Sequence, residues 1–267
     1  MPGPVQSIER AAAILRLLAA SSGRLGVGEL AASLGLARGT VHGILRTLVR
    51  VGFVEQDEAT GKYQLGAALL HLGTSYLDVN ELRSRAINWA DALAARSGEA
   101  VRIGTLLDGK VLVVHHVFRP DDSLQAMDIG TLLPLHASAL GKALLAHDVN
   151  AAASIRGTEL EAYCRRTITD HRALARSLTR VREQGWAAEI EEMVLGEASI
   201  AAPIRGHGGL VVGAIGVSGA VERICRTDPS AGPSAGGAAR RVPDPGLVAY
   251  VRDASRAVSR DLGASRW

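Results

Sequence analysis

Cysteines and long apolar runs are both scarce in this chain. Of its 267 residues only Cys164 and Cys225 are cysteines, and neither stands in a C-x-x-C pair. Two isolated thiols exclude a disulfide-framed scaffold and favour reduced side chains. No segment reaches the roughly 18 uninterrupted apolar residues of a membrane-spanning helix, and Arg16 interrupts the N-terminal apolar run that would otherwise suggest a signal peptide. We therefore expect a cytoplasmic protein.

Acidic side chains are absent from one long segment, residues 31–54. The whole chain has a net charge of only +3, but its first 50 residues carry six arginines against two glutamates. This imbalance is typical of a segment that faces nucleic-acid phosphates. The overall composition, 47% hydrophobic over 267 residues, is sufficient to build the core of one large domain or two ordinary ones.

The segment that lacks acidic residues has the pattern of a helix-turn-helix. Its sequence, ELAASLGLARGTVHGILRTLVRVGFVE at residues 29–55, predicts a short helix over 28–34, a turn at 35–36 and a second helix over 38–51. Apolar residues of the second helix recur at spacing i, i+3, i+4, i+7, so one side of it faces a core. That side consists of Val41, Ile44, Leu45 and Leu48. The opposite side of the helix consists of Gly39, Gly43, Arg46 and Arg50, and is flanked by Thr40 and His42.

A hairpin and a third helix complete the predicted module. Residues 53–55 and 63–65 alternate in polarity, and the connection between them, 57–62, has its glycine late in the loop, as in a β-hairpin. A preceding helix is expected over 7–20. Its N-cap would be Ser7, and its core face Ile8, Ala12, Leu15 and Ala19.

Residues 1–66 therefore predict a winged helix-turn-helix DNA-binding domain. In such a domain the second helix lies in the major groove, and the two copies in a dimer would enter successive grooves about 34 Å apart. The alternative is a three-helix module that makes protein contacts only. We expect Arg38, Thr40 and His42 to approach base edges, and Arg46, Arg50 and Lys62 to hold phosphates.

The remainder divides into a helical connector and a second domain. Residues 67–97 have helical periodicity with a break near 78–80, Gly98 is a suitable terminator, and the apolar stripe is a candidate dimer face. Residues 98–267 predict an α+β domain with a mostly antiparallel sheet, because strand patterns joined by hairpin signals such as Asp108-Gly109 dominate it. Strands are expected over 100–107, 110–118, 124–129, 186–190, 198–204 and 210–217, and helices over 138–146, 174–184 and 247–262.

One segment of the second domain has the composition of a flexible loop. Residues 228–246, DPSAGPSAGGAARRVPDPG, are rich in glycine, proline, serine and alanine. Such a segment cannot bury enough apolar surface to offset the entropy of ordering it. We expect a mobile surface insertion in which Arg240 and Arg241 are solvated. The alternative is that these two arginines contact DNA or a protein partner.

Several ordered motifs resemble the IclR-type family of bacterial transcriptional regulators over nearly the whole chain. The resemblance implies a winged helix-turn-helix, a linker helix, and a GAF-like domain that binds a small organic effector, with no enzymatic activity, cofactor or metal. The matching segments are SIERAAAILRLLA (7–19), residues 29–55, YQLGAALLHLG (63–73), LPLHASALGKALLA (133–146), GWAAEIEEMVLGEASIAAPI (185–204) and AVSRDLGA (257–264).

The same resemblance implies partners. Members of the family act as dimers or dimers of dimers on palindromic operator DNA. The segment YVRDASRAVSRDLGA at 250–264 resembles actinobacterial regulators of glycerol operons. We therefore expect a repressor of a catabolic operon that responds to glycerol 3-phosphate or glycerol.

The resemblance also places the effector between the sheet and the helix that begins near Ser138. The N-terminus of that helix would favour an anionic group. A carboxylate at Glu189 would repel an anion but would accept hydrogen bonds from a polyol. Three positions depart from the family pattern: Gly43 replaces a frequent arginine, Ser199 a frequent cysteine, and Glu189 a usual aspartate. The implied lining residues are Gln125, Met127, Ala139, Leu140, Glu189, Ser199 and Ser218.

Enzymatic and metal sites are weakly indicated. Gly141-Lys142 lacks the other residues of a phosphate-binding loop, and residues 216–220 lack the second glycine of G-x-S-x-G. His115 and His116 are adjacent in an expected strand, so they point to opposite faces and cannot chelate one metal together. The main alternative is a DNA-binding or protein-interaction protein without a ligand, and an enzyme with a fused winged helix is a weaker one.

Overall fold

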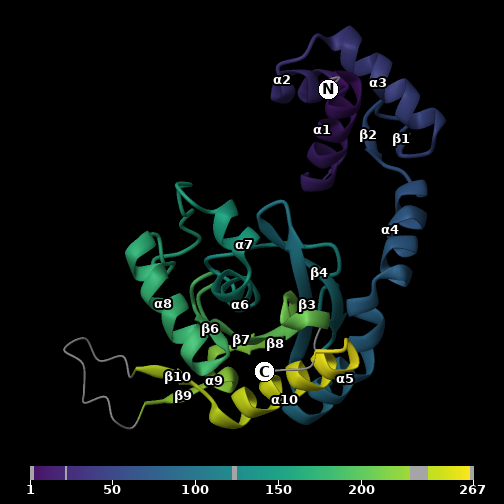
Figure 1. Cartoon of the computed structure of the whole chain (residues 1–267). Coiled ribbons are helices and arrows are strands. Elements are labelled where there is room, and N and C mark those ends of the chain that lie inside the picture. The colour runs from purple at the N-terminus through teal and green to yellow at the C-terminus, as the bar shows by residue number, and fades with distance from the viewer. Residues whose placement is uncertain (1–2, 22, 122–124, 229–239, 265–267) are drawn as a thin grey trace. The chain divides into compact units, whose positions relative to one another are not determined.

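A computed structural model describes residues 3–21, 23–121, 125–228 and 240–264 (Figure 1). The chain divides into two compact units, residues 1–79 and 80–267. Each unit has its own core, so each is described by itself. Residues 229–239 of the expected loop lie outside the described residues.

The first unit is a winged helix-turn-helix, as predicted. Gly35 adopts a left-handed conformation (φ 63°) and ends the first helix of the pair, so that the chain turns sharply into the second. The two wing strands pair antiparallel. The elements are α1 (Gln6–Ala20), α2 (Val27–Leu34), α3 (Arg38–Arg50), β1 (Val54–Gln56), β2 (Tyr63–Leu65) and α4 (Ala68–Val79).

The core of this unit confirms the stripe on α3 and corrects two expectations for α1. Helix α1 begins at Gln6, so Ser7 lies inside the first turn and is not the N-cap. Ile8 is 66% exposed, and α1 is buried instead through Ile14 and Leu18. Successive residues on a helix are rotated by about 100° around its axis. A set of apolar residues displaced by one position along the sequence therefore turns a different side of the helix to the core. The core cluster is Ile14, Leu18, Leu30, Ala31, Val41, Leu45, Leu48, Val54 and Tyr63.

The helical connector breaks where predicted. Helix α5 (Glu81–Ser97) begins after Asn80, whose side chain accepts a hydrogen bond from the Arg83 N–H at 2.8 Å. Gly98 is left-handed (φ 68°) and ends the helix. The buried side of α5, which includes Leu82 and Leu93, packs on the sheet of the second unit.

That sheet is antiparallel throughout, which confirms the α+β expectation. Its six strands follow the order β5-β4-β3-β8-β7-β6. Asp108 and Gly109 have positive φ and form the tight turn between β3 and β4. The strands are β3 (Ala100–Leu107), β4 (Lys110–Val117), β5 (Leu132–Pro134), β6 (Ala187–Ile190), β7 (Glu197–Arg205) and β8 (Val211–Ala220).

The strand expected over 124–129 is wrong for the described residues 125–129, which pair with no strand. In this segment hydrogen bonds between side chains and the backbone replace the backbone pairing of a β-strand. The Gln125 amide accepts from the Arg119 N–H (2.7 Å) and donates to the Arg119 carbonyl (2.9 Å), and the Asp128 N–H donates to His116 Nδ1 (3.2 Å). The edge strand β5 forms later, at 132–134.

Helices cover both faces of the sheet (Figure 1). Helices α5 and α10 (Pro245–Asp261) lie on one face, and α6 (Ala139–His147) and α8 (His171–Gln184) on the other. Strand residues therefore alternate between two apolar layers. On the α6 side the core includes Val111, Leu140, Ala143, Leu144, Ala187, Ala201 and Ala214.

Part of the expected flexible loop is ordered. Strand β10 (Arg241–Pro243) pairs with β9 (Cys225–Thr227), and the Asp244 carboxylate caps α10 by accepting from the Gly246 and Leu247 N–H groups. The expectation of a mobile loop is therefore wrong for residues 241–246, because backbone pairing and a helix cap order them. The remaining short elements are α7 (Val149–Ser154), η1 (His207–Gly209) and α9 (Val221–Ile224).

Close packing at Gly141 fixes where α6 sits. A Cβ at this position would collide with the backbone of Leu135. Gly141→Ala should therefore lower the free energy of unfolding of the second unit by about 1–3 kcal/mol, as overpacking typically does. Thr179→Ala on the exposed side of α8 should change it by less than about 0.5 kcal/mol. Urea unfolding of both variants measures the difference, and equal stability would show that α6 can shift freely.

Candidate DNA-binding surface and ligand cavity

The α3 helix presents an exposed basic surface. Arg38, His42, Arg46 and Arg50 recur every four residues and are exposed, and Thr40 is half-buried beside them. The helix contains no acidic residue. Exposed donors on the second helix of a winged helix-turn-helix match the chemistry of the DNA major groove.

Lys62 belongs to the wing, where the turn is held by Asp57. One Asp57 oxygen accepts from both the Thr60 N–H and the Thr60 hydroxyl, each at 2.7 Å, and these bonds lower the pKa of this carboxyl. Lys62 Nζ lies 3.6 Å from the Glu29 carboxylate. Because this ion pair is largely exposed, it contributes little free energy, and Lys62 can leave Glu29 and bind a phosphate instead.

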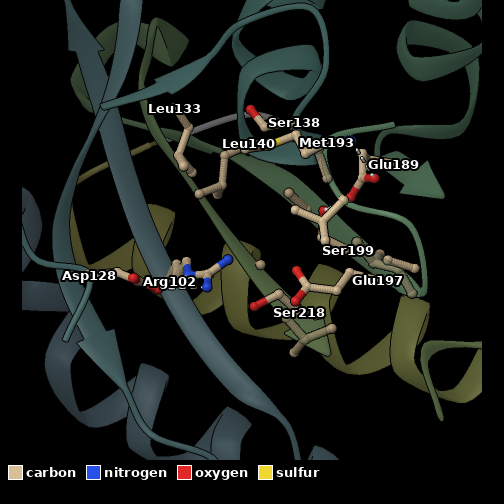
Figure 2. A pocket seen from close by; sticks show the side chains of 17 residues that line it. Arg102, Asp128, Leu133, Ser138, Leu140, Glu189, Met193, Glu197, Ser199 and Ser218 are labelled. Atoms are coloured by element: carbon tan, nitrogen blue, oxygen red, sulfur yellow. Dashed lines mark hydrogen bonds and ion pairs between the residues drawn. The ribbon is translucent and has the colours of Figure 1, made fainter. Parts of the chain in front are cut away.

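The second unit contains a cavity of about 220 Å³ between the N-terminus of α6 and the sheet (Figure 2). Ser138 caps α6 by accepting from the Gly141 N–H at 3.1 Å, and the first-turn N–H groups of Ala139 and Leu140 have no acceptor within the helix. Ser199 and Ser218 are paired on β7 and β8, and both line the cavity.

A buried carboxylate stands at one side of this cavity. Glu189 on β6 is 4% exposed, and burial raises its pKa despite its hydrogen bonds. One oxygen accepts from the Glu192 N–H (2.6 Å) and the Met193 N–H (3.3 Å), and the other from the Ser199 hydroxyl (3.0 Å). Glu189 therefore joins two strands to the segment 191–196 that follows β6.

That segment covers the cavity and is held by a second buried charge. Met193 and Val194 line the cavity. Lys142, which is 1% exposed in the middle of α6, forms an ion pair with Glu192 and donates to the Ala188 carbonyl at 3.3 Å. Burial raises the pKa of Glu192, and the Lys142 charge opposes this rise. The position of the segment is thus tied to α6.

Arg102 on β3 supplies the cation of the cavity. Its Nε and Nη2 contact the same Asp128 oxygen at 2.6 and 2.5 Å. No hydrogen bond to Nη1 is formed by the described residues, and Figure 2 shows the guanidinium directed into the cavity. This nitrogen is therefore available to an anionic or carbonyl oxygen of a ligand.

The structure brings most, but not all, of the expected effector residues together. Ala139, Leu140, Glu189, Ser199 and Ser218 line the cavity. Met127 is 55% exposed and does not line it. Gln125, which is bound to Arg119, lines a neighbouring groove of about 540 Å³ instead. Both side chains point elsewhere because residues 125–129 are not a strand.

Several lining residues were missed by sequence reasoning. They are Arg102, Asp128, Leu133, Met193 and Glu197. A signal for one of them exists. Arg102 stands between Val101 and Ile103 in an otherwise uncharged strand, so a charge points to one face of a buried sheet. The carboxylates and Met193 carry no comparable signal.

Comparisons with known proteins agree with this architecture. The family model described as the IclR helix-turn-helix domain matches residues 7–58, and the bacterial transcriptional regulator IclR C-terminal model matches residues 74–243. A glycerol operon regulatory protein of Streptomyces coelicolor is 54% identical over 263 residues, covering 98% of each chain. One of Streptomyces griseus is 49% identical with the same coverage.

A solved structure shares the fold. The crystal structure of an IclR transcriptional regulator from Alicyclobacillus acidocaldarius has a TM-score of 0.78 and 26% identity, covering 97% of this chain and 99% of its own. Within the described residues, no helix of this chain has the length and apolar character to cross a membrane.

A winged helix-turn-helix joined to an α+β domain with an internal cavity defines a DNA-binding regulator that responds to a small molecule. The chain belongs to the IclR family of bacterial transcriptional regulators. Its relatives are regulators and not enzymes.

The basic surface of α3 can be tested by charge removal. Arg46→Ala should weaken binding to all DNA sequences and reduce the salt slope of log affinity by about one, because one phosphate contact is lost. Arg176→Ala on α8 removes the same charge from the other unit and should change neither quantity. Filter binding at several salt concentrations measures both. Normal affinity of the Arg46 variant at every salt would show that this residue does not face DNA.

Proposed function

We propose that the protein is a repressor of a glycerol operon that responds to a small polyol phosphate, glycerol 3-phosphate, in the cavity beside α6. Two relatives at 54% and 49% identity are named glycerol operon regulatory proteins. Such identity over nearly the whole chain supports the same class of operon here. Free glycerol is the alternative effector.

The buried carboxylate of Glu189 is the observation that carries the effector class. A carboxylate accepts hydrogen bonds only, so it is suited to the hydroxyl donors of a polyol. Ser199 beside it can donate or accept. A cavity of about 220 Å³ is smaller than the roughly 300–1,000 Å³ of sites for drug-sized ligands, which favours a small metabolite.

Arg102 and the first turn of α6 both favour an anionic group, such as a phosphate, in the cavity. A guanidinium and unpaired helix N–H groups both bind anionic oxygens. Asp128 and Glu197 oppose a net negative ligand. The proposed orientation keeps the phosphate at Arg102 and the hydroxyls at Glu189, which separates the phosphate from the Glu189 carboxylate.

Operator DNA would be bound by a dimer, or a dimer of dimers, through α3 and the wing. Arg38, Thr40 and His42 would read base edges, while Arg46, Arg50 and Lys62 would hold phosphates. Occupancy of the cavity would alter the spacing of the two DNA-binding units and so their joint affinity. The connector helices α4 and α5 link the two activities in the chain.

The effector is tested first by binding. Glycerol 3-phosphate at a hundredfold excess over its Kd should stabilise the second unit by about 2.7 kcal/mol, and should release the protein from DNA upstream of its own gene in a gel shift. Stabilisation by glycerol alone would assign the free polyol instead. If neither compound stabilises the protein or alters the gel shift, the glycerol assignment fails while the DNA-binding function stands.

Two variants separate the phosphate contact from the polyol contact. Arg102→Gln combined with Asp128→Asn removes the guanidinium without leaving a lone carboxylate, and should weaken glycerol 3-phosphate roughly tenfold or more. Ser199→Leu should abolish the ligand response and leave operator affinity unchanged, because it fills the cavity. Arg176→Gln is the control for charge. Calorimetric titration decides, and an unaltered ligand affinity in the Ser199 variant would contradict the cavity assignment.

A further inference from the structure

A second cavity, of about 350 Å³, lies at the opposite end of α6 and β7 from the effector cavity. Strand β6 stops pairing with β7 at Ala187 and Ala201, so β7 becomes the sheet edge beyond that point. The cavity opens there, and its lining includes residues of α8 and α10. Figure 1 shows these two helices on opposite faces of the sheet. Its charged and titratable lining consists of His147, Arg182, Glu183, Arg205, Arg252 and Arg256.

The arginines of this cavity differ from those near the effector cavity. Arg102, Arg119 and Arg223 each form an ion pair, with Asp128, Asp121 and Glu99 respectively. Within the described ranges, no carboxylate forms an ion pair with any of the four guanidinium groups here. Glu183 is the single acidic residue of the lining. Four cations from three elements are thus gathered with their charge largely uncompensated.

Backbone hydrogen bonds hold two of these arginines in place. Arg182 Nε donates to the Ala146 carbonyl at 2.8 Å, and Arg205 Nη1 donates to the Gly209 carbonyl at 3.0 Å. Each bond uses one of the five N–H donors of a guanidinium. Both groups are therefore oriented in advance and retain donors for a ligand, which reduces the entropy lost on binding.

Buried serines keep the α10 side rigid. The Ser255 hydroxyl donates to the Pro203 carbonyl at 2.6 Å, and the Arg205 N–H donates to the Ser259 hydroxyl at 2.9 Å. These two hydrogen bonds pair backbone groups of β7 with side chains of α10, and so attach the helix to the edge of the sheet. The same helix carries Arg252 and Arg256 one turn apart, so their positions relative to Arg205 are set by the fold.

His147 lies beside the arginines of the cavity. Burial, and after it the charges of Arg205 and Arg182, lower the pKa of this imidazole to about 4. Its Nδ1 lies 3.5 Å from Arg205 Nη2. Its buried Nε2 has no hydrogen-bond partner among the described residues. A bound anion would offset the charges of these arginines and give the ring a new neighbour.

We propose that this cavity is an anion site for a small phosphate-bearing molecule, separate from the effector cavity. Guanidinium groups bind phosphate oxygens in pairs of parallel hydrogen bonds, and several around one cavity suit a dianion. A volume of about 350 Å³ suits a small molecule better than a polymer. The site shares α6 and β7 with the effector cavity, one at each end of the helix.

The test uses inorganic phosphate as the probe and the full-length protein. Calorimetric titration should show saturable binding, and the Arg252→Gln/Arg256→Gln variant should bind phosphate at least roughly tenfold more weakly, since charged hydrogen bonds are lost. Arg260→Gln removes a charge one turn further along α10, outside this cavity, and should bind as the unaltered protein does. Phosphate should also shift the ring signals of His147 in NMR spectra, assigned with a His147→Gln variant.

Three results would overturn the proposal. One is the absence of saturable phosphate binding, and another is undiminished binding by the Arg252→Gln/Arg256→Gln variant when its circular dichroism spectrum and Tm are unchanged. The third is loss of binding in the Arg102→Gln/Asp128→Asn variant, which would place the phosphate in the effector cavity. His147 signals that shift in the unaltered protein but not in the Arg252→Gln/Arg256→Gln variant would support it.

Discussion

The ion pair between Lys142 and Glu192 is the interaction on which the shape of the effector cavity depends. Lys142 is buried in the middle of α6, and Glu192 belongs to the segment that covers the cavity. Desolvation makes a buried pair a weak source of net stability, but removing one partner leaves an uncompensated charge and is strongly destabilising. The pair therefore holds the covering segment in one position relative to α6.

Glu189 extends this constraint to the ligand. Its carboxylate accepts the N–H groups of Glu192 and Met193 and the hydroxyl of Ser199, so one side chain joins the cavity wall to its cover. A ligand hydroxyl that bonds to Glu189 shares this network and must alter it. Opposite, Arg102 is held by Asp128. The cavity thus has an accepting side and a donating side, set by two strands of one sheet.

Much of the fold was predictable because its signals are local. The hairpin at Asp108-Gly109 and the breaks at Asn80 and Gly98 depend on turn and cap chemistry, and the stripe on α3 on periodicity. The failures fall where a local pattern fits more than one outcome. Ser7 and residues 125–129 have local patterns that fit a cap and a strand. Helix α1 nevertheless begins one residue earlier, without a side-chain cap, and side-chain hydrogen bonds replace strand pairing at 125–129. Met127 was misplaced for the same reason.

The sequence by itself determined the class of protein: the helix-turn-helix pattern, the acid-free segment and the order of helices and strands are all properties of neighbouring residues. It also indicated Glu189 and Ser199 through a family resemblance. Only the tertiary structure decided that Arg102 and Asp128 join them, and that arginines of α8, β7 and α10 meet at one sheet edge. These residues are far apart in the chain, and their meeting follows from strand order and helix packing, which no local pattern encodes.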